Sequence, residues 1–186
     1  MHYTHREIDD TINTLATKLE THSFDPDAIA VPIMTGAMFF AADLLREMGW
    51  KGRIKPVLAS SYHGGRSSGK NKVIMAHMLG RRDPENEYTQ GKQVLIIDDV
   101  LETGKTLERV IRVVRNCLAP KEIVAVALFD KSNEVRGYPT VSRYDTTPVK
   151  TFVGIRAPKD RFLIGFGMDD QGLERSNSFV ICEKMS

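Results

Sequence analysis

The chain has 186 residues, a formal net charge of +2, 41% hydrophobic residues and 27% charged residues. We expect residues 1–186 to form a single domain, because this length can bury one sizeable core. The small net charge does not argue for a nucleic-acid or membrane surface, and no apolar run reaches the roughly 18 residues of a membrane span. The two cysteines fit neither a disulfide framework nor a metal site, and no signal peptide is evident, so we expect a cytoplasmic protein.

The N-terminal quarter of the chain begins with a helix pattern. Thr4 and Glu7 have the spacing of a capping box, and apolar residues recur on one helix face behind them. Residues 29–34 predict a short strand, in which Pro32 argues against a central position in a sheet. Residues 37–48 then predict a second helix, since they are rich in good helix formers.

The middle of the chain contains the clearest strand and helix patterns. Further strands are predicted over residues 54–60 and 72–79, followed by a charged surface connection. The apolar, mostly β-branched run from Val94 to Ile97 is typical of a strand buried on both faces, as in a parallel sheet. Residues 107–118 follow it with helical spacing of apolar side chains.

The last third of the chain is rich in short strand patterns. An apolar strand is predicted over residues 123–129, and shorter ones over 151–155, 162–166 and 178–182. Alternation of strands and helices in the first two-thirds predicts an α/β fold with a parallel twisted sheet flanked by helices. We expect a core of about residues 25–150 and a small strand-rich subdomain from about residues 151–186, with the N-terminal helix as a further candidate part.

Two acids and a polar turn follow the central apolar strand. Asp98 and Asp99 lie where the strand is expected to end, and the turn Thr103–Thr106 precedes the helix. Adjacent side chains on a strand point to opposite faces, so both acids can act alike only if the strand has ended. Helix N-termini beside strand ends bind phosphate, so this segment predicts chemistry on a phosphorylated sugar or nucleotide. A P-loop is disfavoured, because Asp99 stands where its first glycine belongs.

The segment from Val94 to Leu107 resembles the phosphoribosyl diphosphate signature of the type I phosphoribosyltransferases, and the similarity extends over about residues 29–181. The flanking segments resemble the hypoxanthine-guanine branch. The resemblance implies a purine salvage enzyme that transfers ribose 5-phosphate from phosphoribosyl diphosphate to N9 of hypoxanthine or guanine, giving IMP or GMP and diphosphate. It implies Mg²⁺ as cofactor, a homodimer or homotetramer, no nucleic-acid or membrane partner, and a C-terminal subdomain called the hood.

The resemblance also assigns the phosphoribosyl diphosphate site. Asp98 and Asp99 would bind the ribose hydroxyls, directly or through waters on Mg²⁺, and with Asp169 they are the expected metal ligands. Backbone amides, hydroxyls and a helix N-terminus suit the 5′-phosphate. This loop is expected to comprise Glu102, Thr103, Gly104, Lys105 and Thr106.

Two further segments are assigned in the same way. Thr35 and Gly36 lie where the family has a loop whose amides receive the diphosphate, and many members carry a basic residue in place of Thr35. Arg175 matches an arginine that contacts the diphosphate. Ser61 and Tyr62 match the start of a lid, which would shield an oxocarbenium-like sugar from water.

The purine site is expected near the C-terminus. Lys131 matches a lysine that donates to the purine 6-oxo oxygen, Phe162 would stack on the base, and the backbone of Leu163 would contact its edge. Asp169 belongs to the same stretch, 160–169. Glu102 is the candidate catalytic base for the proton of purine N7, although the family usually has aspartate there.

Two other functions stay open on the sequence alone. One is a pyrimidine operon attenuation regulator, which binds RNA and has uracil phosphoribosyltransferase activity, because those proteins share the apolar strand followed by two aspartates. The other is a non-catalytic nucleotide-binding module, suggested by the departures from the family pattern at Glu102 and Thr35. Lys131 and the 160–169 stretch favour the purine transferase.

Overall fold

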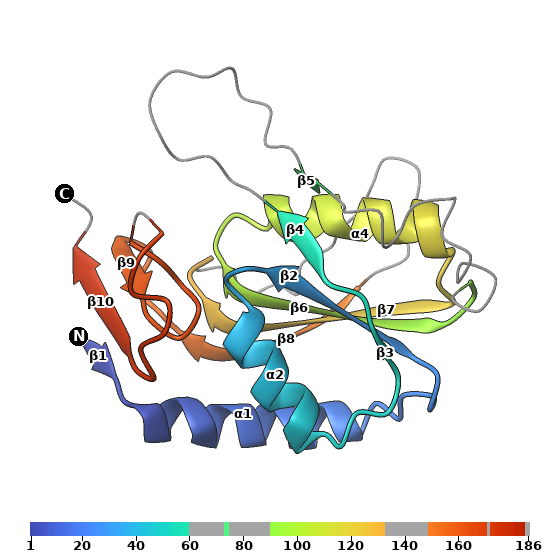
Figure 1. Ribbon diagram of the computed structural model, residues 1–186, viewed down its shortest axis with the longest axis horizontal. Coiled ribbons are helices and arrows are strands. Elements are labelled where there is room, and N and C mark those ends of the chain that lie inside the picture. Colours follow the sequence, from blue (N-terminus) through green and yellow to red (C-terminus); the bar gives the residue numbers. More distant parts are fainter. Residues whose placement is uncertain (60–72, 75–89, 133–148, 171, 185–186) are drawn as a thin grey trace.

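The structure is a computed structural model that describes residues 1–59, 73–74, 90–132, 149–170 and 172–184. Its main sheet has the order β5-β4-β2-β6-β7-β8, with β3 also paired to β2, and every pair is parallel except β4 with β5 (Figure 1). The strands are β2 (Ile29–Met34), β3 (Arg53–Ile54), β4 (Val57–Ala59), β5 (Val73–Ile74), β6 (Gln93–Leu101), β7 (Glu122–Asp130) and β8 (Lys150–Arg156).

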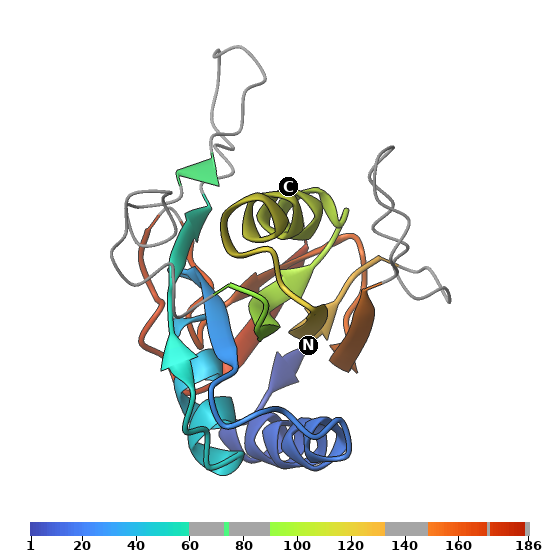
Figure 2. The same ribbon diagram turned by 90° about the vertical axis from the view of Figure 1, so that its right-hand side faces the viewer.

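Helices cover both faces of this sheet. Helices α1 (His5–Glu20) and α2 (Met38–Glu47) lie on one face, and α4 (Lys105–Leu118) lies on the other (Figures 1 and 2). The central strand β6 supplies both cores, since Leu95 and Ile97 pack in the cluster that contains α1 and α2, whereas Val94 and Ile96 pack with α4. This alternation explains the continuous apolar run in the sequence and confirms the predicted fold class.

The predicted capping box begins α1. Thr4 N donates to Glu7 Oε2 at 2.8 Å, and Glu7 N donates to Thr4 Oγ1 at 3.3 Å. Five apolar side chains on one face of the helix are buried beneath it, as the spacing predicts. Among the described residues, no helix is long and apolar enough to cross a membrane.

Pro32 lies in a central strand, which the sequence argued against. Lys55 N donates to Ala30 O at 2.8 Å, and the next bond of a parallel ladder would need an N–H at position 32, which proline lacks. The neighbouring strand is interrupted at this point, between β3 and β4. The missing donor therefore faces a break in the ladder.

A separate antiparallel sheet forms the hood, in the order β1-β10-β9. Its strands are β1 (His2–Tyr3), β9 (Arg161–Ile164) and β10 (Val180–Lys184). We expected the hood to begin near residue 151, but β8 instead extends the main sheet parallel to β7. Strand β7 is buried along almost all of its length, so its backbone groups need a partner strand on each side. The N-terminal contribution to the hood is a strand that precedes α1.

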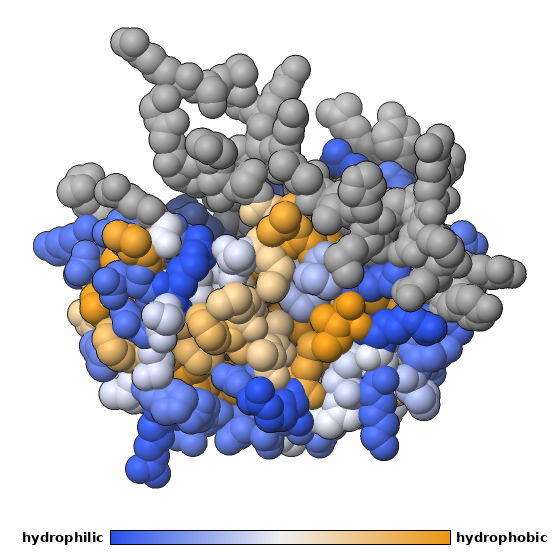
Figure 3. Space-filling view, in the orientation of Figure 1, coloured by the Kyte–Doolittle hydropathy of each residue, from blue (hydrophilic) through white to orange (hydrophobic). Residues whose placement is uncertain are grey.

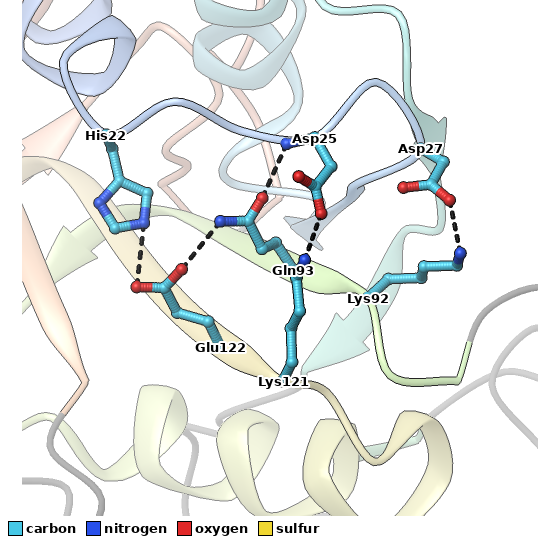
Figure 4. Close-up of polar contacts among 7 residues, drawn as sticks. All are labelled: His22, Asp25, Asp27, Lys92, Gln93, Lys121 and Glu122. Atoms are coloured by element: carbon cyan, nitrogen blue, oxygen red, sulfur yellow. Dashed lines mark hydrogen bonds and ion pairs between the residues drawn. The ribbon is translucent and has the colours of Figure 1, made fainter.

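Polar contacts fix the connection between α1 and β2 at the edge of the sheet where β6 and β7 begin (Figure 4). Lys92 Nζ lies 2.5 Å from Asp27 Oδ2, and Lys121 Nζ lies 2.5 Å from Asp25 Oδ2. Gln93 Oε1 accepts a bond from Asp25 N at 2.7 Å. This edge is opposite the one at which the predicted site residues gather.

Candidate active site

The two adjacent acids lie inside strand β6, not beyond its end. We expected the strand to end at Asp98, but β6 continues to Leu101 because β7 stays paired with it in register. Burial raises the pKa of the Asp98 carboxyl well above its usual value, and the neighbouring charge of Asp99 adds to the effect. Burial also raises the pKa of Asp99. The two carboxyls therefore interact despite their place in a strand.

This acidic pair fits a magnesium ion. Two desolvated carboxyls that repel one another gain from a cation, and Mg²⁺ binds through one or two carboxylates while keeping waters and phosphate oxygens. Asp169, the third expected ligand, is paired with Arg175 instead, with Nη2 2.5 Å from Oδ1. In the described part of the chain, no group of three or more metal-ligating side chains converges.

The loop after β6 presents the N-terminus of α4. Gly104 occupies the position before the helix with φ +70°, a conformation that favours glycine. Its carbonyl accepts a bond from Glu108 N at 2.8 Å, which starts the helix. Gly104 itself has no side chain to cap the helix, and Thr103 Oγ1 accepts a long bond of 3.5 Å from Lys105 N. Thr103 and Lys105 are exposed, and Thr106 is half-buried. These amides and hydroxyls can bind an anion.

Lys131 and Glu102, which were assigned separate roles, form an ion pair. Lys131 Nζ lies 2.8 Å from Glu102 Oε1, and the lysine is only 4% exposed whereas the glutamate side chain is 38% exposed. Lys131 N also donates to Leu101 O at 2.8 Å, which joins the ends of β6 and β7. Ser132 N donates to Asp130 Oδ1 at 2.9 Å and shapes the turn around the lysine.

The loop after β2 contacts both the acidic pair and the hood. Thr35 is exposed, and its peptide bond with Met34 is cis. A β-carbon on Gly36 would lie 2.0 Å from Asp99 Oδ2, so the loop and this carboxylate are in direct contact. A β-carbon on Gly167 would lie 1.9 Å from Gly36 O. Sequence reasoning missed Gly167, and the two glycines at 165 and 167, at the end of the strand predicted over residues 162–166, are the signal that could have found it.

Two of the expected purine-binding residues, Phe162 and Leu163, lie on hood strand β9. Phe162 is 43% exposed, so its ring is accessible to a base, whereas Leu163 is buried in the core that contains α1 and α2. The two neighbours thus take opposite faces of the strand. Ser61 and Tyr62, the expected start of the lid, lie outside the described residues.

Comparisons with known proteins identify the family of this chain. The family model of the phosphoribosyl transferase domain matches residues 3–170. The hypoxanthine phosphoribosyltransferase of Escherichia coli (strain K12) is 31% identical over 143 residues, which are 77% of this chain and 70% of that protein. The hypoxanthine-guanine phosphoribosyltransferase of Staphylococcus aureus (strain Mu50 / ATCC 700699) is 28% identical over 178 residues, 95% of this chain and 89% of that protein.

A solved structure is similar in fold. The hypoxanthine phosphoribosyltransferase of Trypanosoma cruzi matches with a TM-score of 0.71 and 22% sequence identity, covering 99% of this chain and 95% of that one. Its likeness extends over the main sheet and the hood together. The family match and the bacterial relative above 30% identity agree with one another. The chain therefore belongs to the phosphoribosyltransferase family.

Proposed function

We propose that this enzyme transfers ribose 5-phosphate from phosphoribosyl diphosphate to N9 of hypoxanthine or guanine, giving IMP or GMP and diphosphate. The observation that carries the proposal is the buried Lys131, held by Glu102 at the sheet edge where the acidic pair also lies. The named relatives act on the same class of base. For this reason neither the pyrimidine regulator nor the non-catalytic module is favoured.

Lys131 would select the base. Its ammonium donates to a 6-oxo oxygen but meets only donors on a 6-amino group, so adenine is rejected. Because Lys131 is already paired with Glu102 at 2.8 Å, an incoming O6 would take over part of this interaction. Glu102 would then accept the N7 proton, since its partly exposed carboxylate reaches the same space.

The phosphoribosyl diphosphate would lie between β6, α4 and the loop after β2. Asp98 and Asp99 would bind the ribose hydroxyls, directly or through waters on Mg²⁺, and the ion would supply positive charge for the departing diphosphate. The 5′-phosphate would lie at the amides and hydroxyls of Thr103–Thr106, beside the N-terminus of α4. Arg175 uses two of its N–H groups on Asp169 and Gly167 O and keeps further donors for the diphosphate.

We also infer a homodimer or homotetramer. Exposed apolar side chains occur on α2, β3 and β4, and Figure 3 shows apolar surface gathered over the middle of the face to which these elements belong. Such a patch is typical of an interaction surface. These side chains are Met38, Ile54 and Leu58. Light scattering of the purified protein, compared with an Ile54→Lys variant, tests this surface: an unchanged mass in the variant would contradict it.

The deciding experiment is diphosphate release with phosphoribosyl diphosphate and Mg²⁺ across hypoxanthine, guanine, xanthine, adenine and uracil. Turnover confined to 6-oxopurines supports the proposal, turnover with uracil alone would favour the regulator, and no turnover with any base would favour the binding module. In the active enzyme, Glu102→Gln should lower kcat by about 10²–10⁴-fold. Lys131→Ala should mainly reduce the preference for 6-oxopurines over adenine.

A further inference from the structure

Gly167 joins the hood to the loop after β2 through a contact that has no room for a side chain. Its φ is +101°, and a β-carbon built there would lie 1.9 Å from Gly36 O, where real β-carbons stay beyond 3.0 Å. The obstructing atom belongs to the backbone, so no change of rotamer can relieve the clash. Any larger residue at position 167 must move the hood and the loop apart.

Gly36 is held on its other side by the acidic pair. A β-carbon on Gly36 would meet Asp99 Oδ2 at 2.0 Å. The carboxylate of Asp99, the backbone of Gly36 and the backbone of Gly167 are therefore stacked in direct contact. This stack links strand β6, the loop after β2 and the hood, which are far apart in the sequence.

Arg175 fixes the hood side of this stack. Its Nη1 donates to Gly167 O at 2.5 Å, and Gly167 N donates to Arg175 O at 2.8 Å. Its Nη2 also pairs with Asp169 Oδ1 at 2.5 Å. Strand β9, which carries Phe162, ends only three residues before Gly167 at Ile164, so the position of Gly167 sets that of β9.

We propose that Gly167 is a positioning residue that sets the distance between the purine-binding strand and the diphosphate loop. The inference rests on the proposed function, which places the base on β9 and the diphosphate at the amides after β2. The reacting atoms, N9 and the ribose C1′, approach from these two sides. A β-carbon on Gly167 would separate them by about 1 Å, and such a misplacement costs on the order of 10²-fold in rate.

The chain provides two matched controls for Gly167→Ala. Gly172 has a similar φ of +91° but nothing within 4 Å of its β-carbon position, so Gly172→Ala adds the backbone strain without the clash. Gly165 has φ +105° and would meet Phe179 O at 2.1 Å, so Gly165→Ala adds a clash that does not involve the diphosphate loop. Comparison of the three variants separates the contact with Gly36 from strain and from damage to the hood.

The experiment measures kcat, KM for each substrate, the affinity for inorganic diphosphate with Mg²⁺ by calorimetry, and Tm. For Gly167→Ala we expect kcat to fall by about 10²-fold and diphosphate to bind about tenfold more weakly, whereas Gly172→Ala should stay within about twofold of the wild type. Gly165→Ala should lower Tm while diphosphate affinity is kept. Equal kcat and diphosphate affinity in Gly167→Ala and Gly172→Ala would overturn the inference.

Failure of the proposed function can be distinguished from failure of this inference. An inactive wild type refutes the transferase, while the diphosphate affinities of the variants still test the contact. If Gly167→Ala does not fold, hydrogen exchange of the wild type replaces it. Adding inorganic diphosphate and Mg²⁺ should slow exchange of the amides in 165–175 across the contact and leave those of β8 unchanged, and slowing confined to the loop after β2 would refute the inference.

Discussion

Replacing either member of the Glu102–Lys131 pair should destabilise the protein unequally. Glu102→Gln leaves a lysine that is 4% exposed without its counter-charge, whereas Lys131→Met leaves a glutamate that water can still reach. A hydrogen bond to a charged group contributes about 1.5–3 kcal/mol. An exposed ion pair contributes only about 0.2–1 kcal/mol. Because one partner is buried and the other is partly wet, we expect a coupling free energy of about 1.5 kcal/mol.

The assay is a double-mutant cycle by urea denaturation at pH 7 without ligands. Glu102→Gln should lower the free energy of unfolding by about 2 kcal/mol and Lys131→Met by about 0.5 kcal/mol, because the desolvated partner bears the cost. Glu108→Gln is the matched control, since Glu108 pairs with Arg112 at 3.0 Å on the exposed side of α4 and should lose less than about 0.5 kcal/mol. Equal losses at 102 and 131, or a coupling near zero, would refute the reasoning.

Three further predictions follow from the fold. Burial and the charge of Asp99 raise the pKa of Asp98 in the ligand-free folded state. Between the ordinary carboxyl pKa and this raised pKa, the folded state binds more protons than the unfolded state. The free energy of unfolding therefore falls as pH rises through that interval. Asp98→Asn should flatten that fall in urea titrations at several pH values, and an unaltered profile would contradict it. Gly154→Ala places a β-carbon 2.6 Å from Thr11 Cγ2 and 2.7 Å from Leu128 O, so it should cost about 1–3 kcal/mol in urea denaturation. Thr4→Ala removes the cap of α1 and should cost about 1 kcal/mol in the same assay, whereas a loss below about 0.3 kcal/mol would show that the cap is dispensable.

Most elements of the main sheet could be predicted from the sequence because their signals are local. The β-branched run before Asp98 and the helical spacing after Thr106 each identify an element within a few residues. The capping box at Thr4 is equally local. Patterns of this kind depend on burial of a face, so they predict the layers of the fold as well as its elements.

The hood and the details of the site depend on contacts between distant segments. Strand β1 has only two residues and pairs with β10, which lies far from it in the sequence, so no local pattern could predict it. The continuation of β6 through both aspartates depends on its pairing with β7. The ion pair of Glu102 depends on the position of Lys131, which directly follows β7. The close packing of Gly167 on Gly36 could not be predicted, because the sequence shows only that a glycine is present at each position.

The hood joins the first strand of the chain to the last, and this has a consequence for protein synthesis. In the register of the sheet, Tyr3 faces Val180, and Cys182 N donates to Met1 O at 3.0 Å. A ribosome releases β10 only after all other described elements have emerged, so β1 must stay unpaired while the main sheet forms. The hood should therefore form after the larger part of the described main sheet has become compact.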